Sequence, residues 1–304
     1  MKRVRLAAAA LVGIAIGSCS SVPNPGPTAS QAPVAKPLSA ANRDISPPER
    51  RRFAIEGIVQ QGGVAIGSAP SRTVALTLDG EPVDFAPDGR FLIAFDRDAR
   101  PSALLVARLA DGSEIREPLT IAPGAWRIER LSTLPRFPVP TAEFGRLRDP
   151  ELARIAAART IVTGSQGWRQ RFQWPVTGRI SGWFGSQRVY RGEPGAYHSG
   201  VDVAKPAGTI LFAPADGVVI LTADRPFTLE GNLLMIDHGM GLNSAFLHLS
   251  RIDVRVGDRV TRGQPLGAIG ATGRATGPHM HWGLKWKDRR LDPALLAGPM
   301  PVSQ

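Results

Sequence analysis

The segment HSGVDVA, residues 198–204, and the segment HMHWGLKW, residues 279–286, decide the fold. In both segments, small or polar residues alternate with large apolar residues, which is the period of a strand that buries one face. We expect the apolar members to point into a core, namely Val201, Val203, Met280 and Trp282. The sequence therefore predicts two half-buried strands whose outer faces carry imidazoles and a carboxylate.

All histidines of the chain fall in its C-terminal third, namely His198, His238, His248, His279 and His281. The four-residue spacing of His198 and Asp202, and the two-residue spacing of His279 and His281, put each pair on one strand face. In SAFLHLS, the same alternation predicts that Phe246 and His248 share a face. His238 lies between Asp237 and Gly239, a turn-forming context that favours a structural role.

These side chains fit the requirements of a catalytic zinc site, which takes three nitrogen or oxygen ligands and keeps one open position. His198, Asp202 and one of His279 and His281 supply the three ligands. The spacing does not decide which of those two histidines binds the metal. The imidazoles left over would serve as general base and transition-state stabiliser.

The motif His-x-x-x-Asp, followed much later by Gly-Pro-His-x-His, resembles that of the LytM/lysostaphin-type zinc endopeptidases, peptidase family M23. The resemblance covers residues 173–297 and includes WPVTGRISGWFG, APADGVV and VRVGDRVTRGQPLGAIG in the family's order. It implies one Zn²⁺ per chain, held by His198, Asp202 and His281, and catalytic roles for His248 and His279. It also implies an antiparallel β-sandwich with an open groove and the metal at its floor.

The chain departs from the family pattern at two positions. Gly283 stands where many members have Glu, and Phe246 stands where many have Tyr. The family does not use that Glu as a ligand, so the ligand set is unaffected. Tyr190 or Tyr197 could supply a hydroxyl near the cleft in place of the missing phenol.

The preceding residues predict a mostly β chain with one helical connector. Residues 50–135 alternate in TVALTL and RFLIAF, and Asp-Gly pairs at 79–80, 88–89 and 111–112 predict hairpin turns in a small β-sandwich. Residues 136–172 form the connector, where Asp149-Pro150-Glu151 predicts a helix start. The peptidase domain is expected at 173–297, followed by a tail at 298–304.

Residues 1–19 have the features of an export signal with a lipoprotein box. Lys2, Arg3 and Arg5 precede a short apolar stretch, and the only cysteine, Cys19, follows it directly. The Pro-, Ala- and Ser-rich residues 20–49 predict an extended, disordered tether. We therefore expect a bacterial periplasmic protein, anchored to the outer membrane through lipid on Cys19.

The overall composition limits the function classes. One cysteine excludes an internal disulfide framework and a cysteine zinc finger, and the formal net charge of +11 favours anionic polymers as partners. We expect peptidoglycan stem peptides as the substrate and no nucleic acid. Residues 50–135 are a candidate dock for another cell-wall enzyme.

Three functions compete for the C-terminal segment. The first is a zinc-dependent endopeptidase that hydrolyses peptide cross-links of bacterial peptidoglycan, with the D-alanyl–diaminopimelate link expected by family analogy. The second is a non-catalytic LytM-type regulator that activates other cell-wall hydrolases, although such proteins lose zinc ligands and this chain keeps them all. The third, a biotinyl or lipoyl carrier, needs an exposed lysine at a hairpin tip, and Lys205, Lys285 and Lys287 do not provide one.

Overall fold

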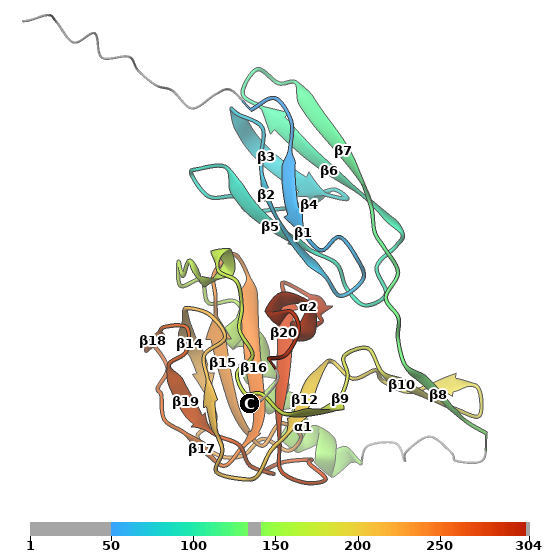
Figure 1. Ribbon diagram of the computed structural model, residues 1–304, viewed down its shortest axis with the longest axis vertical. Helices are drawn as coiled ribbons and strands as arrows, with labels where there is room; N and C mark the ends of the chain where they lie inside the picture. Colours follow the sequence, from blue (N-terminus) through green and yellow to red (C-terminus); the bar gives the residue numbers. More distant parts are fainter. Residues whose placement is uncertain (1–49, 133–140, 302–304) are drawn as a thin grey trace, which may run out of the picture. The chain divides into compact units, whose positions relative to one another are not determined.

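Strands dominate the computed structural model, which describes residues 50–132 and 141–301 (Figure 1). The predicted mostly β fold is therefore confirmed, and the structure contains several antiparallel sheets. The signal, Cys19 and the tether at 20–49 lie outside the described residues, as does the end of the tail at 302–304. Residues 47–304 form one compact unit. The predicted division of that unit into a small β domain and a peptidase domain stays a prediction.

The first described segment forms two antiparallel sheets. One sheet has the order β1-β2-β5, and the other has the order β4-β3-β6-β7. The Asp-Gly pairs predicted as turns lie at 79–80 between β3 and β4, at 88–89 before β5, and at 111–112 between β6 and β7, each with its glycine at positive φ. The strand bounds are β1 Ala54–Gly57, β2 Val64–Ser68, β3 Thr73–Leu78, β4 Glu81–Pro82, β5 Arg90–Ala94, β6 Ser102–Leu109 and β7 Glu114–Thr120.

An eight-stranded antiparallel sheet forms the second half of the structure, in the order β18-β14-β15-β16-β20-β12-β9, with β21 also paired to β20 (Figure 1). The two segments that decide the fold are β12 and β20, and they pair with each other. The bounds are β9 Arg179–Gly182, β12 Gly200–Ala204, β14 Gly217–Thr222, β15 Asn232–Asp237, β16 Leu242–Leu249, β18 Arg259–Val260, β20 His279–Trp286 and β21 Arg289–Leu291.

Two three-stranded sheets complete the strands. One has the order β13-β19-β17, with bounds Ile210–Phe212, Pro265–Ala268 and Arg251–Ile252. The other joins β8, Ile128–Leu131, in parallel to β10, Gln187–Tyr190, which also pairs with β11, Glu193–Pro194. A 3₁₀ turn covers Gly167–Arg169, and the short helix α2 covers Pro293–Ala297.

The apolar residues of β12 and β20 lie on the core face, as the alternation predicts. Val201, Val203, Met280 and Trp282 are fully buried. The ring of Phe246 stacks on Trp282, with centroids 6.5 Å apart and an interplanar angle of 13°. This packed layer leaves the opposite face of the sheet for the histidines and Asp202.

The predicted start of the connector helix is wrong. Helix α1 runs Ala142–Arg159, and its N-cap is Thr141, whose hydroxyl accepts a hydrogen bond from the amide of Phe144. Pro150 therefore lies inside the helix rather than at its first position. A Thr N-cap satisfies one of the unpaired amides of the first turn, and proline at 150 removes only one later backbone donor.

Helix α1 packs against the eight-stranded sheet. Its buried residues Ile155 and Ala158 join an apolar cluster with residues of β14 and β15, namely Ile220, Leu221, Leu233 and Met235, together with Phe227. Leu247, which pairs with His281 across β16 and β20, also packs on this cluster. The helix thus covers the same sheet face that carries the histidines.

A largely buried ion pair between Arg148 and Glu230, together with contacts of Glu151, holds α1 in this position. The guanidinium of Arg148 donates to both carboxylate oxygens of Glu230, at 2.5 and 2.7 Å, and also to Glu151 at 3.1 Å. Glu151 in turn accepts hydrogen bonds from the amide and hydroxyl of Thr228. Neither α1 nor α2, the α-helices of the described residues, has the length and apolarity needed to cross a membrane.

Candidate metal centre

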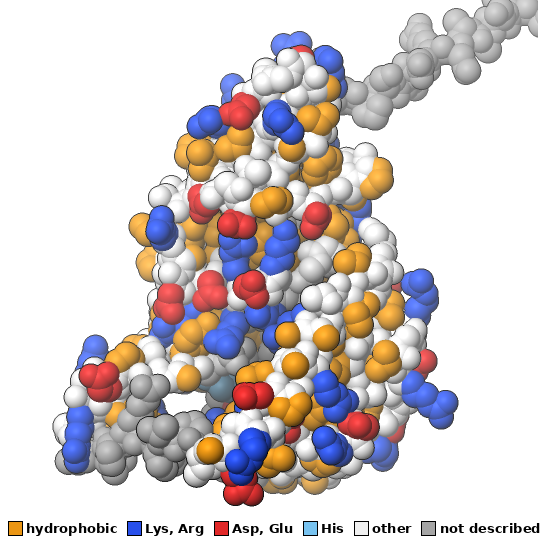
Figure 2. Space-filling view, turned by 180° about the vertical axis from the view of Figure 1, so that it is seen from behind, with side chains coloured by type: hydrophobic (Ala, Val, Ile, Leu, Met, Phe, Trp, Pro, Cys, Tyr) orange, Lys and Arg blue, Asp and Glu red, His pale blue; other side chains and the backbone are white. Residues whose placement is uncertain are grey.

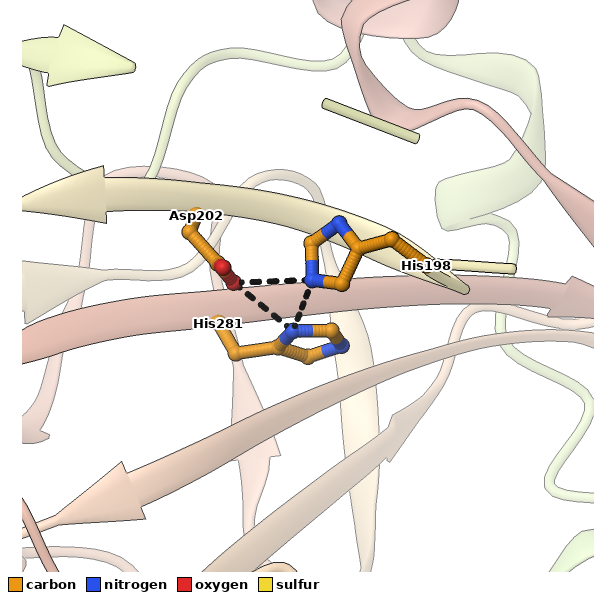
Figure 3. A group of neighbouring side chains, drawn as sticks. All are labelled: His198, Asp202 and His281. Carbon is orange, nitrogen blue, oxygen red and sulfur yellow. Dashed lines mark hydrogen bonds and ion pairs between the residues drawn. The ribbon is translucent and has the colours of Figure 1, made fainter. Parts of the chain in front are cut away.

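Three side chains from β12, β20 and the turn before β12 converge on one point (Figure 3). The Nδ1 atom of His281 lies 2.8 Å from Oδ1 of Asp202 and 3.1 Å from Nε2 of His198. The same Asp202 oxygen lies 3.2 Å from Nε2 of His198. Two imidazole nitrogens and one carboxylate oxygen therefore form a small triangle.

The triangle fits a zinc ion by donor type and by size. A tetrahedral zinc ion with bonds of about 2.0–2.1 Å needs donors roughly 3.3 Å apart, and the three separations here are close to that value. Two nitrogens and one oxygen also leave a fourth position open, as catalytic zinc sites do. Within residues 50–132 and 141–301, no other group of three or more His, Asp or Glu side chains lies close enough together to hold a metal ion.

Backbone carbonyls fix the orientation of the imidazoles. His198 donates from Nδ1 to the carbonyl of Trp183 at 3.1 Å, which turns its Nε2 lone pair toward Asp202. A metal-ligating histidine usually anchors its other ring nitrogen in this way, which sets the tautomer. Trp183, which lies outside the His-x-x-x-Asp motif, therefore helps to orient His198.

Two further imidazoles lie beside the triangle. His248 donates from Nδ1 to the carbonyl of Thr272 at 2.8 Å, and His279 donates from Nδ1 to the carbonyl of Gly277 at 2.8 Å. Their ring centroids are 4.8 Å apart, and Nε2 of His279 lies 3.8 Å from Oδ1 of Asp202. The structure thus brings all five predicted site residues together and places His281, rather than His279, in the donor triangle.

The predicted common face of Phe246 and His248 is wrong. Phe246 faces the core, where it stacks on Trp282, whereas His248 lies beside His279 on the other face. The alternation fails because His248 has a φ of 64°, in the left-handed region. The pairing of β15 with β16 is irregular at the same place, between Asn232 and Leu234. One residue in this conformation turns the His248 side chain toward the metal centre.

The electrostatics of the triangle favour an ionised carboxylate. Burial disfavours the charged form of Asp202, but hydrogen bonds with His198 and His281 outweigh it and hold its pKa well below the usual value. Burial also disfavours the charged form of His198, yet Asp202 raises the pKa of that imidazole overall. Burial lowers the pKa of His281. The carboxylate therefore stays available as an anionic ligand at neutral pH.

His248 is held in its neutral form. Burial lowers its pKa to about 4, although the hydrogen bond to Thr272 acts in the other direction. Because its Nδ1 carries the proton given to Thr272, the lone pair on Nε2 is available to accept a proton. The neutral ring can therefore accept a hydrogen bond or a proton at Nε2.

The remaining polar candidates have other partners. The hydroxyl of Tyr197 donates to Asp96 at 3.3 Å and so has a partner outside the five site residues. Tyr190 lies at the end of β10, and its part in the site stays a prediction. His238 is fully buried, donates from Nδ1 to the carbonyl of Asp216 and accepts at Nε2 from the hydroxyl of Ser244. Its role is structural, as its turn context predicts.

No pattern in the sequence predicts that α1 forms a wall of the site. A cavity lies between this helix and the sheet, and its lining includes Arg159, Lys285 and His281, one of the three candidate donors. Figure 2 shows a histidine side chain at the floor of a hollow, with Lys and Arg side chains near it. The spacing of apolar residues along α1 could have indicated that the helix packs against other elements. It could not have indicated the sheet face on which the helix packs.

Comparison with known proteins identifies residues 196–293 as a match to the model of peptidase family M23. A crystal structure from Pseudomonas aeruginosa assigned to peptidase M23 is 32% identical, with a TM-score of 0.60. The match covers 79% of this chain and 95% of that one. The similarity therefore extends well beyond the segment that carries the histidines.

Curated relatives match a shorter part of the chain. Peptidoglycan DD-endopeptidase ShyA of Vibrio cholerae is 38% identical over 44% of this chain and 31% of its own length. Peptidoglycan DD-endopeptidase ShyB of the same organism is 34% identical over 46% of this chain and 28% of its own length. The chain thus matches less than a third of the length of either relative.

Proposed function

The chain belongs to peptidase family M23, and we propose that it is a zinc-dependent endopeptidase that hydrolyses peptide cross-links of bacterial peptidoglycan. The observation that carries the proposal is the convergence of His198, Asp202 and His281 with two further imidazoles beside them. The relatives named peptidoglycan DD-endopeptidases support the choice of substrate.

The three donors would hold the zinc ion, and His248 and His279 would carry out the proton transfers. When bound, zinc supplies Lewis-acid polarisation of the scissile carbonyl and lowers the pKa of water toward neutrality. His248, which is neutral and presents the Nε2 lone pair, takes the proton of the attacking water. His248 then returns this proton to the nitrogen of the leaving amine. His279, whose ring lies 4.8 Å from that of His248, would stabilise the developing oxyanion.

The complete site favours this enzyme over a non-catalytic regulator of the same fold. A regulator has no need of metal donors or of imidazoles with fixed tautomers. Here three backbone carbonyls orient three of the imidazoles, namely those of His198, His248 and His279. Such anchoring is the expected support for a working metal site.

Muropeptide analysis tests the proposed activity. The chain from residue 20 onward, loaded with zinc, would be incubated with purified bacterial cell walls, and the soluble fragments separated and weighed by mass spectrometry. We expect cross-linked dimers to give monomers, with the D-alanyl–diaminopimelate bond hydrolysed. A chelator should abolish the reaction, and added zinc should restore it. Intact cross-links in the zinc-loaded reaction would contradict the proposal.

We further propose that the protein is exported and anchored through lipid on Cys19. The support is the charged and apolar pattern of residues 1–18 directly before the only cysteine. Substituting Cys19→Ser should move the protein from the membrane fraction to the soluble periplasmic fraction and abolish labelling by a fatty-acid probe. Unchanged fractionation and labelling would contradict the anchor.

A further inference from the structure

A cavity between α1 and the sheet opens beside the metal centre. Its lining includes Leu152 and Ile155 of α1, Ala245 and Leu247 of β16, and the ligand His281. Its volume of about 170 Å³ exceeds the roughly 10–15 Å³ that one water needs, so it can take several atoms of a substrate. The cavity therefore adjoins the reaction centre and is large enough for part of a peptide.

Four cationic side chains line this cavity. Arg148 donates hydrogen bonds to Glu230, which also lines it, and the other three are Arg159, Lys285 and Arg290. Lys285 and Arg290 face each other across β20 and β21, and Arg159 reaches the cavity from the last turn of α1. The Nε atom of Arg159 is buried and has no hydrogen-bond partner among the described residues. An unpaired buried donor is costly, so a partner that the structure does not contain would stabilise it.

The cationic side chains also repel one another. Burial lowers the pKa of Arg159, and the charge of Arg290 lowers it further. Burial likewise lowers the pKa of Lys285, with Arg159 as the next cause. Both groups would therefore be stabilised by an anion placed between them.

The acidic side chains near the cavity offset this repulsion only in part, because burial and Arg290 lower the pKa of Arg159 more than Glu230 and Asp288 raise it. Glu230 lines the cavity, but both of its carboxylate oxygens accept hydrogen bonds from Arg148. Asp288 lies 3.3 Å from Nζ of Lys285, yet its side chain is fully exposed to solvent. A screened surface contact of this kind contributes little. Among the described residues, the cavity therefore keeps an excess of positive charge.

Between His281 and Lys285, this face of β20 carries no side chain, because the residue between them is Gly283. His281, Gly283 and Lys285 occupy alternate positions of β20 and so share a face. A Cβ atom on Gly283 would find its nearest neighbours, Nε2 of His281 and the carbonyl of Ser199, at an ordinary 3.6 Å. A Cβ atom thus fits at this position, and glycine adds no side chain to the cavity lining there.

We infer that the cavity formed by Arg159, Lys285 and Arg290 binds a carboxylate of the substrate peptide, and that this contact selects the peptide cleaved. The inference rests on the proposed peptidase function, because it takes the occupant of the cavity to be the peptide that is cleaved. Lys285 lies four residues after His281 on β20, which corresponds to roughly 13 Å along the strand. The diaminopimelate residue on the carbonyl side of the scissile D-alanyl bond carries a free carboxyl at the end of a long side chain, so this carboxyl can lie several ångströms from the bond.

Paired substrates test the contact in the full zinc-loaded chain. Two cross-linked muropeptides would differ only in the diaminopimelate carboxyl, free in one and amidated in the other, and kcat/KM would be measured for both. We expect the wild type to prefer the free carboxyl by about tenfold or more, the scale of one charge-assisted hydrogen bond. Arg159→Gln and Lys285→Gln should lower kcat/KM for the free carboxyl only.

A matched control tests whether the loss of any positive charge on α1 has the same effect on the substrate preference. Arg154 lies on the same helix, is exposed, and pairs with Asp224 on the surface, so Arg154→Gln should keep the wild-type preference. Gly283→Glu, checked for folding by circular dichroism, should place a carboxylate in the cavity and remove the preference. Equal cleavage of both substrates by the wild type, or an equal loss on both in the variants, would overturn the inference.

A binding measurement tests the carboxylate contact independently of the peptidase activity. If the wild type cleaves neither muropeptide, the proposed function fails, and the cavity is judged by calorimetry on the full chain after chelation. Under those conditions we expect a stem tetrapeptide with a free carboxyl to bind more tightly than its amide, and Arg159→Gln to abolish the difference. Equal binding of the two peptides would overturn the inference independently of any activity.

Discussion

The Nδ1 atom of His281 lies 2.8 Å from the Oδ1 atom of Asp202, and the two residues are direct partners in the pairing of β12 with β20. The register of this one strand pair therefore determines the distance between two of the three metal donors. A shift of one residue would move one of the two side chains to the core face. The core packing of Val201 and Trp282 thus also positions the metal site.

Close contact between the backbones of β12 and β20 leads to the first prediction. At Gly200 an added Cβ would meet the carbonyl oxygen of Trp282 at 2.4 Å and Nε2 of His281 at 2.6 Å. We expect Gly200→Ala to displace His281 and weaken zinc binding by about 10- to 100-fold, the effect of disturbing the support of a ligand. Zinc titration with a competing chelator measures the change.

Gly277→Ala is the matched control for this substitution. A Cβ at Gly277 has no neighbour within 4 Å, although the residue lies close to the site and its carbonyl holds His279. Zinc affinity should therefore stay within about twofold of the wild type. Equal zinc affinity of Gly200→Ala and wild type would show that the strand contact does not control the donor positions.

The sequence alone predicts those parts of the site that depend on local strand geometry. Alternation in β12 and β20 predicts the burial of Val203 and Met280, and it predicts the outward faces that carry Asp202 and His281. These predictions succeed because the side-chain period of a strand is two wherever the backbone stays extended.

Other parts of the structure depend on single backbone conformations or on distant packing. The left-handed φ of His248 reverses the alternation on β16, and no local pattern marks that residue. Thr141 caps the observed helix and Asp149 lies inside it, although the Asp-Pro-Glu sequence also fits a helix start. The cavity joins residues of α1 and β20 that lie more than a hundred positions apart, so it follows only from the tertiary fold.

The ion pair of Arg148 with Glu230 should stabilise the packing of α1. Both side chains are largely buried, with 12% and 15% of their surfaces exposed, so removal of one charge leaves the other unpaired. We expect Arg148→Met to lower the free energy of unfolding by about 2 kcal/mol. Urea denaturation followed by tryptophan fluorescence gives this value.

Arg154→Met serves as the comparison for this pair. Arg154 pairs with Asp224, and these two side chains are 40% and 70% exposed. A surface pair of this kind contributes about 0–1 kcal/mol, so the loss should be small. Equal losses in the two variants would contradict a special role of Arg148 in holding α1.

Acid should destabilise the protein through His238. Burial lowers the pKa of this imidazole to about 4 in the folded state, against a usual value of 6.5. The unfolded chain therefore binds more protons below pH 6.5, and the folded state loses stability as the pH falls from 6.5 to 4. Above pH 6.5 both states are neutral at this residue and the effect is absent. The total loss is about 3 kcal/mol.

His238→Asn measures this contribution, because asparagine does not titrate in this range. Free energies of unfolding would be compared at several pH values between 4 and 8. We expect the difference between wild type and variant to shrink by about 3 kcal/mol as the pH falls through this window. A difference that does not change with pH would show that His238 is not held neutral.

The central claim is that His281 is a metal ligand and that His248 and His279 act on the substrate. Zinc content and cell-wall digestion, measured together on four purified variants of matched fold, test it most directly. Asp202→Ala and His281→Ala should lose zinc and activity together. His248→Ala and His279→Ala should keep close to one zinc per chain, yet lose activity by roughly 100-fold or more. Loss of zinc from His279→Ala with retention in His281→Ala, or normal digestion by both His248→Ala and His279→Ala, would contradict the account.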